Sequence, residues 1–289
     1  MTEAKVVSRE SLPSWSELQH LSDDALLDLF RSSPHELLAD LTINTTSVRM
    51  IGRDTVIKYP CAPYEVAAQA HIASTTSILT PAIRRTIPGR TGLNNFYVVM
   101  DFVHGTTLDS SWPRLAPWRK LMVVWTMRRY VRELRKVPFQ HASKEPWPGP
   151  LGDEPIACIG PLFGEYDAGP FSTYAGLADC FAHKLDVAVR MKKAPPFVAP
   201  FDASMPLVFT HLDLVPHNVM LDDAGRVWVI DWGISGFYPQ WFEYAAMAAG
   251  WEDMSRYGGF LARGIAGFYE PQRCFIDSIC WALVTGAFM

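Results

Sequence analysis

The arrangement of apolar residues changes near Gly105, and this change restricts the fold more than any other feature of the chain. Up to that point the sequence contains short β-like runs over residues 42–50, 55–59 and 96–102. Beyond it, apolar residues recur at helical spacing, most clearly over residues 117–136. Strands and helices that are separated along the chain are typical of α+β proteins. We therefore predict an α+β fold with two lobes, a small β-rich N-lobe and a larger, mainly helical C-lobe.

Three units are expected along the chain. Ser22 can cap a helix over residues 22–30, because Asp23 and Asp24 follow in the first turn and leucines then recur. Residues 52–54 suit a tight hairpin turn between the first two strands. The predicted units are an N-terminal helical extension (1–40), an N-lobe (41–104) and a C-lobe (105–289).

Charge and composition exclude several classes of protein. The formal charge of −4 includes no long run of Lys or Arg, which phosphate-backbone binding requires, so no nucleic-acid partner is expected. No stretch reaches the roughly 18 continuous apolar residues that span a bilayer, so no membrane partner is expected. The five cysteines are odd in number and scattered, which argues against a disulfide framework and a zinc site. We predict a soluble cytoplasmic protein and leave its oligomeric state open.

Residues 209–221 carry the most informative motif, His-x-Asp-x-x-x-x-Asn. It is formed by His211, Asp213 and Asn218, and a hairpin signal then leads to Asp231 at the end of an apolar run. Phosphoryl transfer requires a carboxylate near the acceptor hydroxyl and oxygen ligands that hold Mg²⁺ against the phosphates. The spacing supplies both, because one loop presents Asp213 and Asn218 and the next hairpin delivers Asp231. The expected role of His211 is structural, holding the loop by hydrogen bonds.

This arrangement resembles the aminoglycoside phosphotransferase and choline kinase superfamily, in particular its fungal branch. The resemblance covers nearly all of the chain after about residue 40, including residues 160–171 and 231–244. It implies a protein-kinase-like two-lobed fold in which Asp213 is the catalytic base. It also implies that Asn218 and Asp231 belong to the catalytic set and bind magnesium.

Two details qualify the resemblance. Protein kinases share the His-x-Asp-x-x-x-x-Asn signature but continue with Asp-Phe-Gly and, later, Ala-Pro-Glu. Here Trp232 and Gly233 follow Asp231, and no Ala-Pro-Glu occurs, which favours a small-molecule acceptor over a protein. In addition, Leu212 stands where the family commonly has glycine, and no Gly-x-Gly-x-x-Gly precedes Lys58.

The resemblance also assigns nucleotide-binding residues in the N-lobe. Lys58 lies in the second strand, where such kinases keep the lysine that binds the α- and β-phosphates, and Glu65 would orient it through an ion pair. Backbone groups of roughly Asp101 to Val103 would contact the adenine of ATP, and residues 44–47 would cover the phosphates. Taken alone, Lys58 also fits an ordinary lysine at a strand edge, and Glu65 a charge on a helix surface.

Aromatic and acidic residues gather after Asp231, in the region that forms the acceptor pocket in relatives. Trp232, Trp241 and Glu243 are the expected pocket residues, because rings and carboxylates both favour cations and suit an apolar or amine-bearing molecule. The alternative is that these aromatic side chains pack the helical lobe.

Together these features predict an enzyme, a small-molecule kinase that uses ATP and Mg²⁺ to transfer the γ-phosphate to a hydroxyl of a metabolite or natural product. The alternative is a kinase-fold protein of specialised metabolism that has lost phosphotransfer. Such a protein would bind or convert a hydrophobic small molecule.

Overall fold

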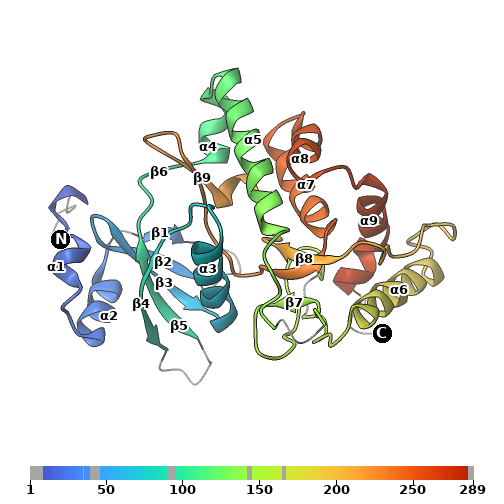
Figure 1. Ribbon diagram of the computed structural model, residues 1–289, viewed down its shortest axis with the longest axis horizontal. Helices are drawn as coiled ribbons and strands as arrows, with labels where there is room; N and C mark the ends of the chain where they lie inside the picture. Colours follow the sequence, from blue (N-terminus) through green and yellow to red (C-terminus); the bar gives the residue numbers. More distant parts are fainter. Residues whose placement is uncertain are drawn as a thin grey trace, which may run out of the picture.

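The structure is a computed structural model and describes residues 9–34, 36–39, 46–89, 95–141, 145–164 and 167–285 (Figure 1). Its N-lobe is built on a five-stranded antiparallel sheet in the order β1-β2-β3-β5-β4. The strands are β1 (Glu36–Ala39), β2 (Ser47–Gly52), β3 (Thr55–Cys61), β4 (Ile83–Pro88) and β5 (Phe96–Asp101).

The predicted hairpin is present, since β2 pairs with β3 on either side of residues 53–54. Residues 42–45 of the predicted first strand lie outside the described residues. Strand β4 was not predicted, because its arginines and the prolines at and near its ends obscure the alternation expected of a strand.

Different helices cover the two faces of this sheet. They are α1 (Trp15–Leu18), α2 (Asp23–Ser32) and α3 (Pro63–Thr75). Ile57 and Val99 point to the face where Leu26 and Phe30 of α2 pack, while the alternate residues Val56 and Val98 belong to the cluster that includes Val66 of α3. Figure 1 shows α1 and α2 at the outer end of the molecule and α3 toward the C-lobe.

The N-terminal helix forms as its sequence predicts. Ser22 is the N-cap of α2, and its Oγ accepts a hydrogen bond from the Ala25 N–H at 3.3 Å. The apolar face of α2 closes one side of the N-lobe core, so this segment is part of the fold rather than a loose tail.

The C-lobe is mainly helical. Its helices are α4 (Leu108–Ser111), α5 (Pro117–Leu134), α6 (Tyr174–Arg190), α7 (Phe242–Met254), α8 (Gly258–Ala266) and α9 (Glu270–Thr285). Its largest core cluster includes Trp232, Tyr244 and Trp251, which are fully buried together with Met127 of α5. Among the described residues, no helix combines the length and the apolar character needed to cross a membrane.

Two small sheets position the loops of the C-lobe. One has the order β10-β9-β6 and the other β7-β11-β8. Their strands are β6 (Gly105–Thr107), β7 (Gly149–Pro150), β8 (Leu207–Thr210), β9 (Val219–Asp222), β10 (Val227–Val229) and β11 (Gly236–Pro239). The segment from β8 to β9, which includes the short 3-10 helix Pro216–Asn218, and the segment from β10 to β11 therefore begin and end side by side.

Gly105 joins the two lobes in a place that only glycine fits. It pairs with Asp222 at the start of β6, and a Cβ atom there would collide with the carbonyl oxygen of Leu221. The close approach of β6 to β9 ties the chain that leaves the N-lobe to the strand that follows the His-x-Asp-x-x-x-x-Asn motif.

Candidate active site

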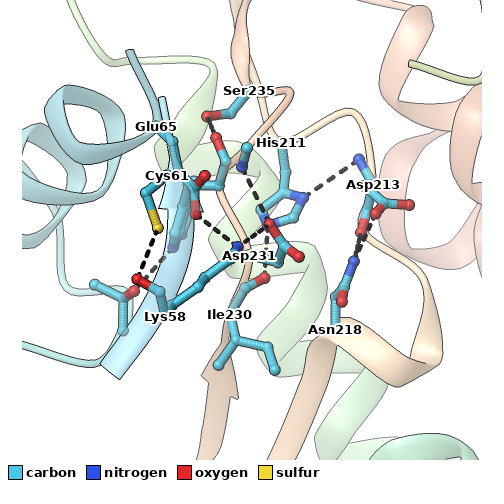
Figure 2. Close-up of polar contacts among 12 residues, drawn as sticks. Lys58, Cys61, Glu65, His211, Asp213, Asn218, Ile230, Asp231 and Ser235 are labelled. Carbon is cyan, nitrogen blue, oxygen red and sulfur yellow. Dashed lines mark hydrogen bonds and ion pairs between the residues drawn. The ribbon is translucent and has the colours of Figure 1, made fainter. Parts of the chain in front are cut away.

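A lysine from the N-lobe connects two acidic side chains from different parts of the chain (Figure 2). Lys58 of β3 places its Nζ 2.6 Å from Oε1 of Glu65 on α3 and 2.9 Å from Oδ1 of Asp231. Lys58 and Asp231 are 173 positions apart in the sequence. The structure therefore brings together the lysine expected to bind phosphates, the glutamate expected to orient it and the aspartate expected to bind metal.

The charges in this cluster are mutually stabilised. Burial opposes the charge of Lys58, but the carboxylates of Asp231 and Glu65 outweigh it and raise the pKa of the lysine. Burial likewise opposes the charge of Asp231, and Lys58 nevertheless holds the pKa of this carboxyl below its usual value. The Lys58 side chain is 10% exposed, whereas that of Asp231 is 42% exposed. Asp231 thus presents an ionised, accessible carboxylate beside a buried cation.

The motif residues form a second, adjacent group. Asn218 donates from Nδ2 to Oδ2 of Asp213 at 2.7 Å and to the Asp213 carbonyl oxygen at 3.0 Å. The Ile230 N–H donates to the carbonyl oxygen of Asn218 at 3.0 Å, which fixes this loop against the residue before Asp231. Figure 2 shows Asp213 and Asn218 on the far side of Asp231 from Lys58.

His211 holds the loop as a neutral ring. The Asp213 N–H lies 3.3 Å from His211 Nδ1, which must therefore accept, so that Nε2 carries the proton and donates to the Ile230 carbonyl oxygen at 3.1 Å. The ring is fully buried, and this burial lowers the pKa of His211 to about 4. The predicted structural role fits this geometry, since neither nitrogen is left for a substrate.

Glu243 of α7 holds the backbone of the loop that carries His211. Its carboxylate accepts hydrogen bonds from the backbone N–H of His211 at 2.7 Å and of Leu212 at 3.2 Å. Leu212 is fully buried with φ of 66°, in the left-handed region that glycine adopts most readily. The glutamate thus holds a conformation that a leucine would otherwise avoid.

Asp231, like Leu212, has a strained backbone conformation. Asp231 has φ of 63°, also in the left-handed region, and its Oδ1 accepts a hydrogen bond from the Gly233 N–H at 3.3 Å. The side chain that follows it, Trp232, is fully buried and donates from Nε1 to Oγ1 of Thr80 at 2.8 Å. Trp232 therefore lies in the core while the Asp231 carboxylate before it faces Lys58.

Comparisons with known proteins agree with this geometry. Residues 58–274, more than half of the chain, match the model of the phosphotransferase enzyme family. The chain belongs to the phosphotransferase enzyme family. No curated protein matches its sequence.

Solved aminoglycoside phosphotransferases share the fold of this phosphotransferase. APH(2'')-IIa in a ternary complex with streptomycin and ATP has a TM-score of 0.58 at 12% identity, with 91% of each chain covered. ADP-bound APH(2'')-Ib has a TM-score of 0.57 at 11% identity, with 93% of each chain covered. The GDP complex of aminoglycoside 2'-phosphotransferase-IIIa has a TM-score of 0.56 at 10% identity, with 86% of this chain and 84% of that chain covered. These likenesses confirm the two-lobed kinase-like fold.

The segment expected to contact the adenine connects the lobes of the phosphotransferase. The Asp101 N–H donates to the Ala82 carbonyl oxygen and the Phe102 N–H to that of Asp54, so both are occupied. Within the described part of the chain, the Val103 N–H has no such partner. The Asp101 carboxylate binds Arg84 through two hydrogen bonds of 2.6 and 2.9 Å. The Asp101 side chain is therefore committed to Arg84, and the contact of Val103 with a nucleotide stays a prediction.

The structure corrects the expected acceptor pocket. Trp232 and Trp241 are 0% exposed and Glu243 is 1% exposed, so none of them has surface with which to line an open pocket. Trp241 donates from Nε1 to the Asp202 carbonyl oxygen at 3.0 Å within a cluster of aromatic rings. The packing alternative is therefore the correct one for both tryptophans, and Glu243 supports the loop that begins at His211. No local sequence pattern predicts this role, because Glu243 lies 32 positions after His211, whose backbone N–H it binds.

The oxygen donors present suit Mg²⁺. Asp231 supplies an ionised and accessible carboxylate, and Asn218, whose Nδ2 is used by Asp213, has its amide oxygen left for a cation. Within the described ranges, no three His, Cys, Asp or Glu side chains are grouped to hold a metal on their own.

Proposed function

We propose that this protein is an ATP-dependent phosphotransferase that transfers the γ-phosphate to a hydroxyl group of a small molecule. The observation that carries this proposal is the position of Asp231, which contacts Lys58 and lies between this lysine and the Asp213–Asn218 pair. A phosphate-binding cation, a metal-binding carboxylate and a candidate base thus converge on one place, as in-line phosphoryl transfer requires.

Each side chain has a distinct task in this proposal. Lys58, held by Glu65, binds the α- and β-phosphates, and the Val103 N–H hydrogen-bonds the base of the nucleotide. Asn218 and Asp231 would hold Mg²⁺, which supplies charge neutralisation at the phosphates when it is bound with ATP. Asp213 accepts the proton of the acceptor hydroxyl as its oxygen attacks phosphorus.

The electrostatics of Asp213 support its role as the base. Burial raises the pKa of this carboxyl above its ordinary value, while His217 and the hydrogen bond from Asn218 act in the opposite direction. A raised pKa makes a carboxylate a stronger proton acceptor, and catalysis improves as the pKa of the base approaches the working pH. Asp213 is partly exposed, so an acceptor can reach it.

The fold neighbours support a small-molecule acceptor and a purine nucleotide. APH(2'')-IIa was solved with streptomycin and ATP, and the 2'-phosphotransferase-IIIa with GDP. The absence of the protein-kinase Ala-Pro-Glu segment from the sequence points the same way. We therefore propose a hydroxyl-bearing small molecule as the acceptor and ATP as the donor.

Nucleotide binding and transfer are tested in two steps. Thermal denaturation should show a midpoint raised by about 5 to 10 °C at Mg·ATP concentrations near 100 times Kd, which corresponds to about 2.7 kcal/mol of linkage. Transfer from γ-labelled ATP to a panel of hydroxyl-bearing small molecules should then be detected with the wild type and lost with Asp213→Asn. If millimolar Mg·ATP leaves the midpoint unchanged, the kinase assignment fails and the binding-protein alternative replaces it.

A further inference from the structure

Helix α5 has apolar residues on two opposite faces. Its buried face, which includes Val123, Met127 and Tyr130, packs into the C-lobe core. The opposite face exposes four large apolar side chains at helical spacing. They are Trp118, Leu121, Met122 and Trp125, with exposures of 58%, 69%, 52% and 60%.

A residue of the adjacent helix extends this surface. Gly264 of α8 lies against Val124 of α5, and Arg128 donates to the Gly264 carbonyl oxygen. Phe260 precedes Gly264 by one turn on the same face of α8 and is 75% exposed. We call the surface formed by Trp118, Leu121, Met122, Trp125 and Phe260 the α5 ridge. Figure 1 shows that the N-terminal half of α5 projects beyond α4 and α8 at the top of the view.

The chain segment that forms α5 is basic. Between Asp109 and Glu133 the chain has no acidic residue, and it has six basic ones, which are Arg114, Arg119, Lys120, Arg128, Arg129 and Arg132. Among these, Arg129 forms the one ion pair with a described residue, at 3.6 Å from Glu133.

The basic residues also continue the ridge along the helix. Arg129 and Arg132 follow Trp125 by four and seven positions, so they lie on the same face, roughly 6 and 10 Å farther along the axis. A helix that enters a lipid surface by its first two turns would therefore place these guanidinium groups near the phosphate level. The apolar part of the ridge includes two tryptophans, Trp118 and Trp125, and tryptophan side chains favour the boundary between apolar and aqueous phases.

We propose that the α5 ridge docks the protein on the surface of a membrane that contains anionic lipids. Apolar side chains at the crest would enter the headgroup boundary, and the basic residues beside them would bind lipid phosphates and carboxylates. The protein lies on the membrane and does not span it. No active-site residue belongs to α5 or α8, so the ridge acts independently of phosphotransfer.

Other occupants fit less well. In a twofold dimer through the ridge, the basic residues of one copy would face those of the other, and like charges oppose such a contact. A folded protein partner would need an acidic groove shaped to this projecting helix, whereas a fluid bilayer accepts a convex ridge of any outline. Charge and shape together therefore favour lipid.

Co-sedimentation of the whole protein with vesicles tests the proposal. Vesicles of phosphatidylcholine with 30% phosphatidylserine, at low salt, should bind it, and vesicles of phosphatidylcholine alone should not. Trp118→Ser with Trp125→Ser should abolish binding, since both side chains are already exposed and their loss should leave the thermal midpoint unchanged. Arg129→Glu with Arg132→Glu should weaken binding by about 25-fold or more, at about 5-fold for each basic residue.

Matched variants elsewhere on the surface serve as controls. Phe197→Ser with Leu37→Ser removes two exposed apolar side chains, and Lys184→Glu with Arg190→Glu reverses two charges on α6. Both should bind vesicles as the wild type does. Three outcomes would each overturn the proposal. The protein could bind neutral and anionic vesicles equally, or it could bind neither. Sedimentation velocity could also reveal a dimer that the two tryptophan substitutions convert to monomer. The experiment measures vesicle binding and not phosphotransfer, so it tests the ridge even when no acceptor has been identified.

Discussion

The two halves of the active site are held by different forces. The Lys58 half is assembled by ion pairs that join the N-lobe to Asp231 of the C-lobe. The Asp213 half is assembled within the C-lobe by hydrogen bonds between side chains and backbone groups: Asn218 and His211 donate to carbonyl oxygens, and Glu243 accepts from the His211 N–H. The first arrangement depends on charge and on the relative position of the lobes, whereas the second fixes the shape of one loop. We therefore expect substitutions in the two halves to fail in different ways.

The largest difference should separate Asp213→Asn from Asp231→Asn. Asp213→Asn should lower turnover by roughly 10²- to 10⁴-fold, as is typical for loss of a positioned base, and should leave Mg·ATP binding almost intact. Asp231→Asn should weaken Mg·ATP binding by about 10- to 100-fold as well, because Mg²⁺ prefers carboxylate to amide oxygen. Calorimetry with Mg·ATP and a transfer assay on both variants measure these effects. Normal transfer by Asp213→Asn would contradict the assignment of the base.

The contributions of Glu243 and His211 to the free energy of unfolding should change in opposite directions as the pH rises. Burial raises the pKa of Glu243 to about 7, so its contribution falls as the pH rises from the unfolded value near 4.5 toward 7. The pKa of His211 is lowered to about 4, so its contribution rises as the pH increases from 4 to the unfolded value near 6.5. Each amounts to about 3 kcal/mol, and the wild type should show little net slope where the two windows overlap.

Single substitutions should expose each slope. Glu243→Gln should make the free energy of unfolding increase with pH between about 4.5 and 6.5, because the His211 contribution then acts alone. His211→Asn should make it decrease over the same interval. Urea unfolding at several pH values measures both, with Glu154→Gln on an exposed loop as the control. Parallel pH profiles for all four proteins would show that neither group titrates as described.

Removing Lys58 should affect both stability and nucleotide binding. Lys58→Met leaves Glu65 buried without its cation and should cost about 1 to 3 kcal/mol, since Asp231 can still be solvated. Adding Glu65→Gln should recover much of this stability without restoring nucleotide affinity, which should remain lowered by roughly 10- to 100-fold. Unfolding curves and nucleotide titrations of the two variants test this. Recovery of both properties would mean that Lys58 does not contact the nucleotide.

The smallest effect is expected at Trp241, outside both halves. Trp241→Phe loses the hydrogen bond to the Asp202 carbonyl oxygen inside the aromatic cluster and should lower stability by about 1 to 2 kcal/mol. Because the side chain is buried, KM for ATP and for the acceptor should both stay unchanged. A selective rise in KM for the acceptor would place Trp241 at the pocket after all.

Local patterns were enough for several elements. The helix capped by Ser22, the turn between β2 and β3 and the hairpin of β9 and β10 each depend on residues that are close in sequence. Their signals are capping, turn chemistry and apolar periodicity, which act over a few residues. The short strands β7, β8 and β11 have too few residues for such a signal. They form because they pair with one another, β11 with both β7 and β8.

The sequence by itself determined the family and the candidate residues. The decisive motif lies within one short stretch of chain, which contains His211, Asp213, Asn218 and Asp231. Only the tertiary structure decided what each residue touches. It joined Lys58 to Asp231, turned Trp232 and Trp241 into the core and placed Glu243 against the loop that carries His211. The physical reason is that burial and ion pairing depend on distances in space between residues that are tens to hundreds of positions apart. Sequence periodicity carries no information about those distances.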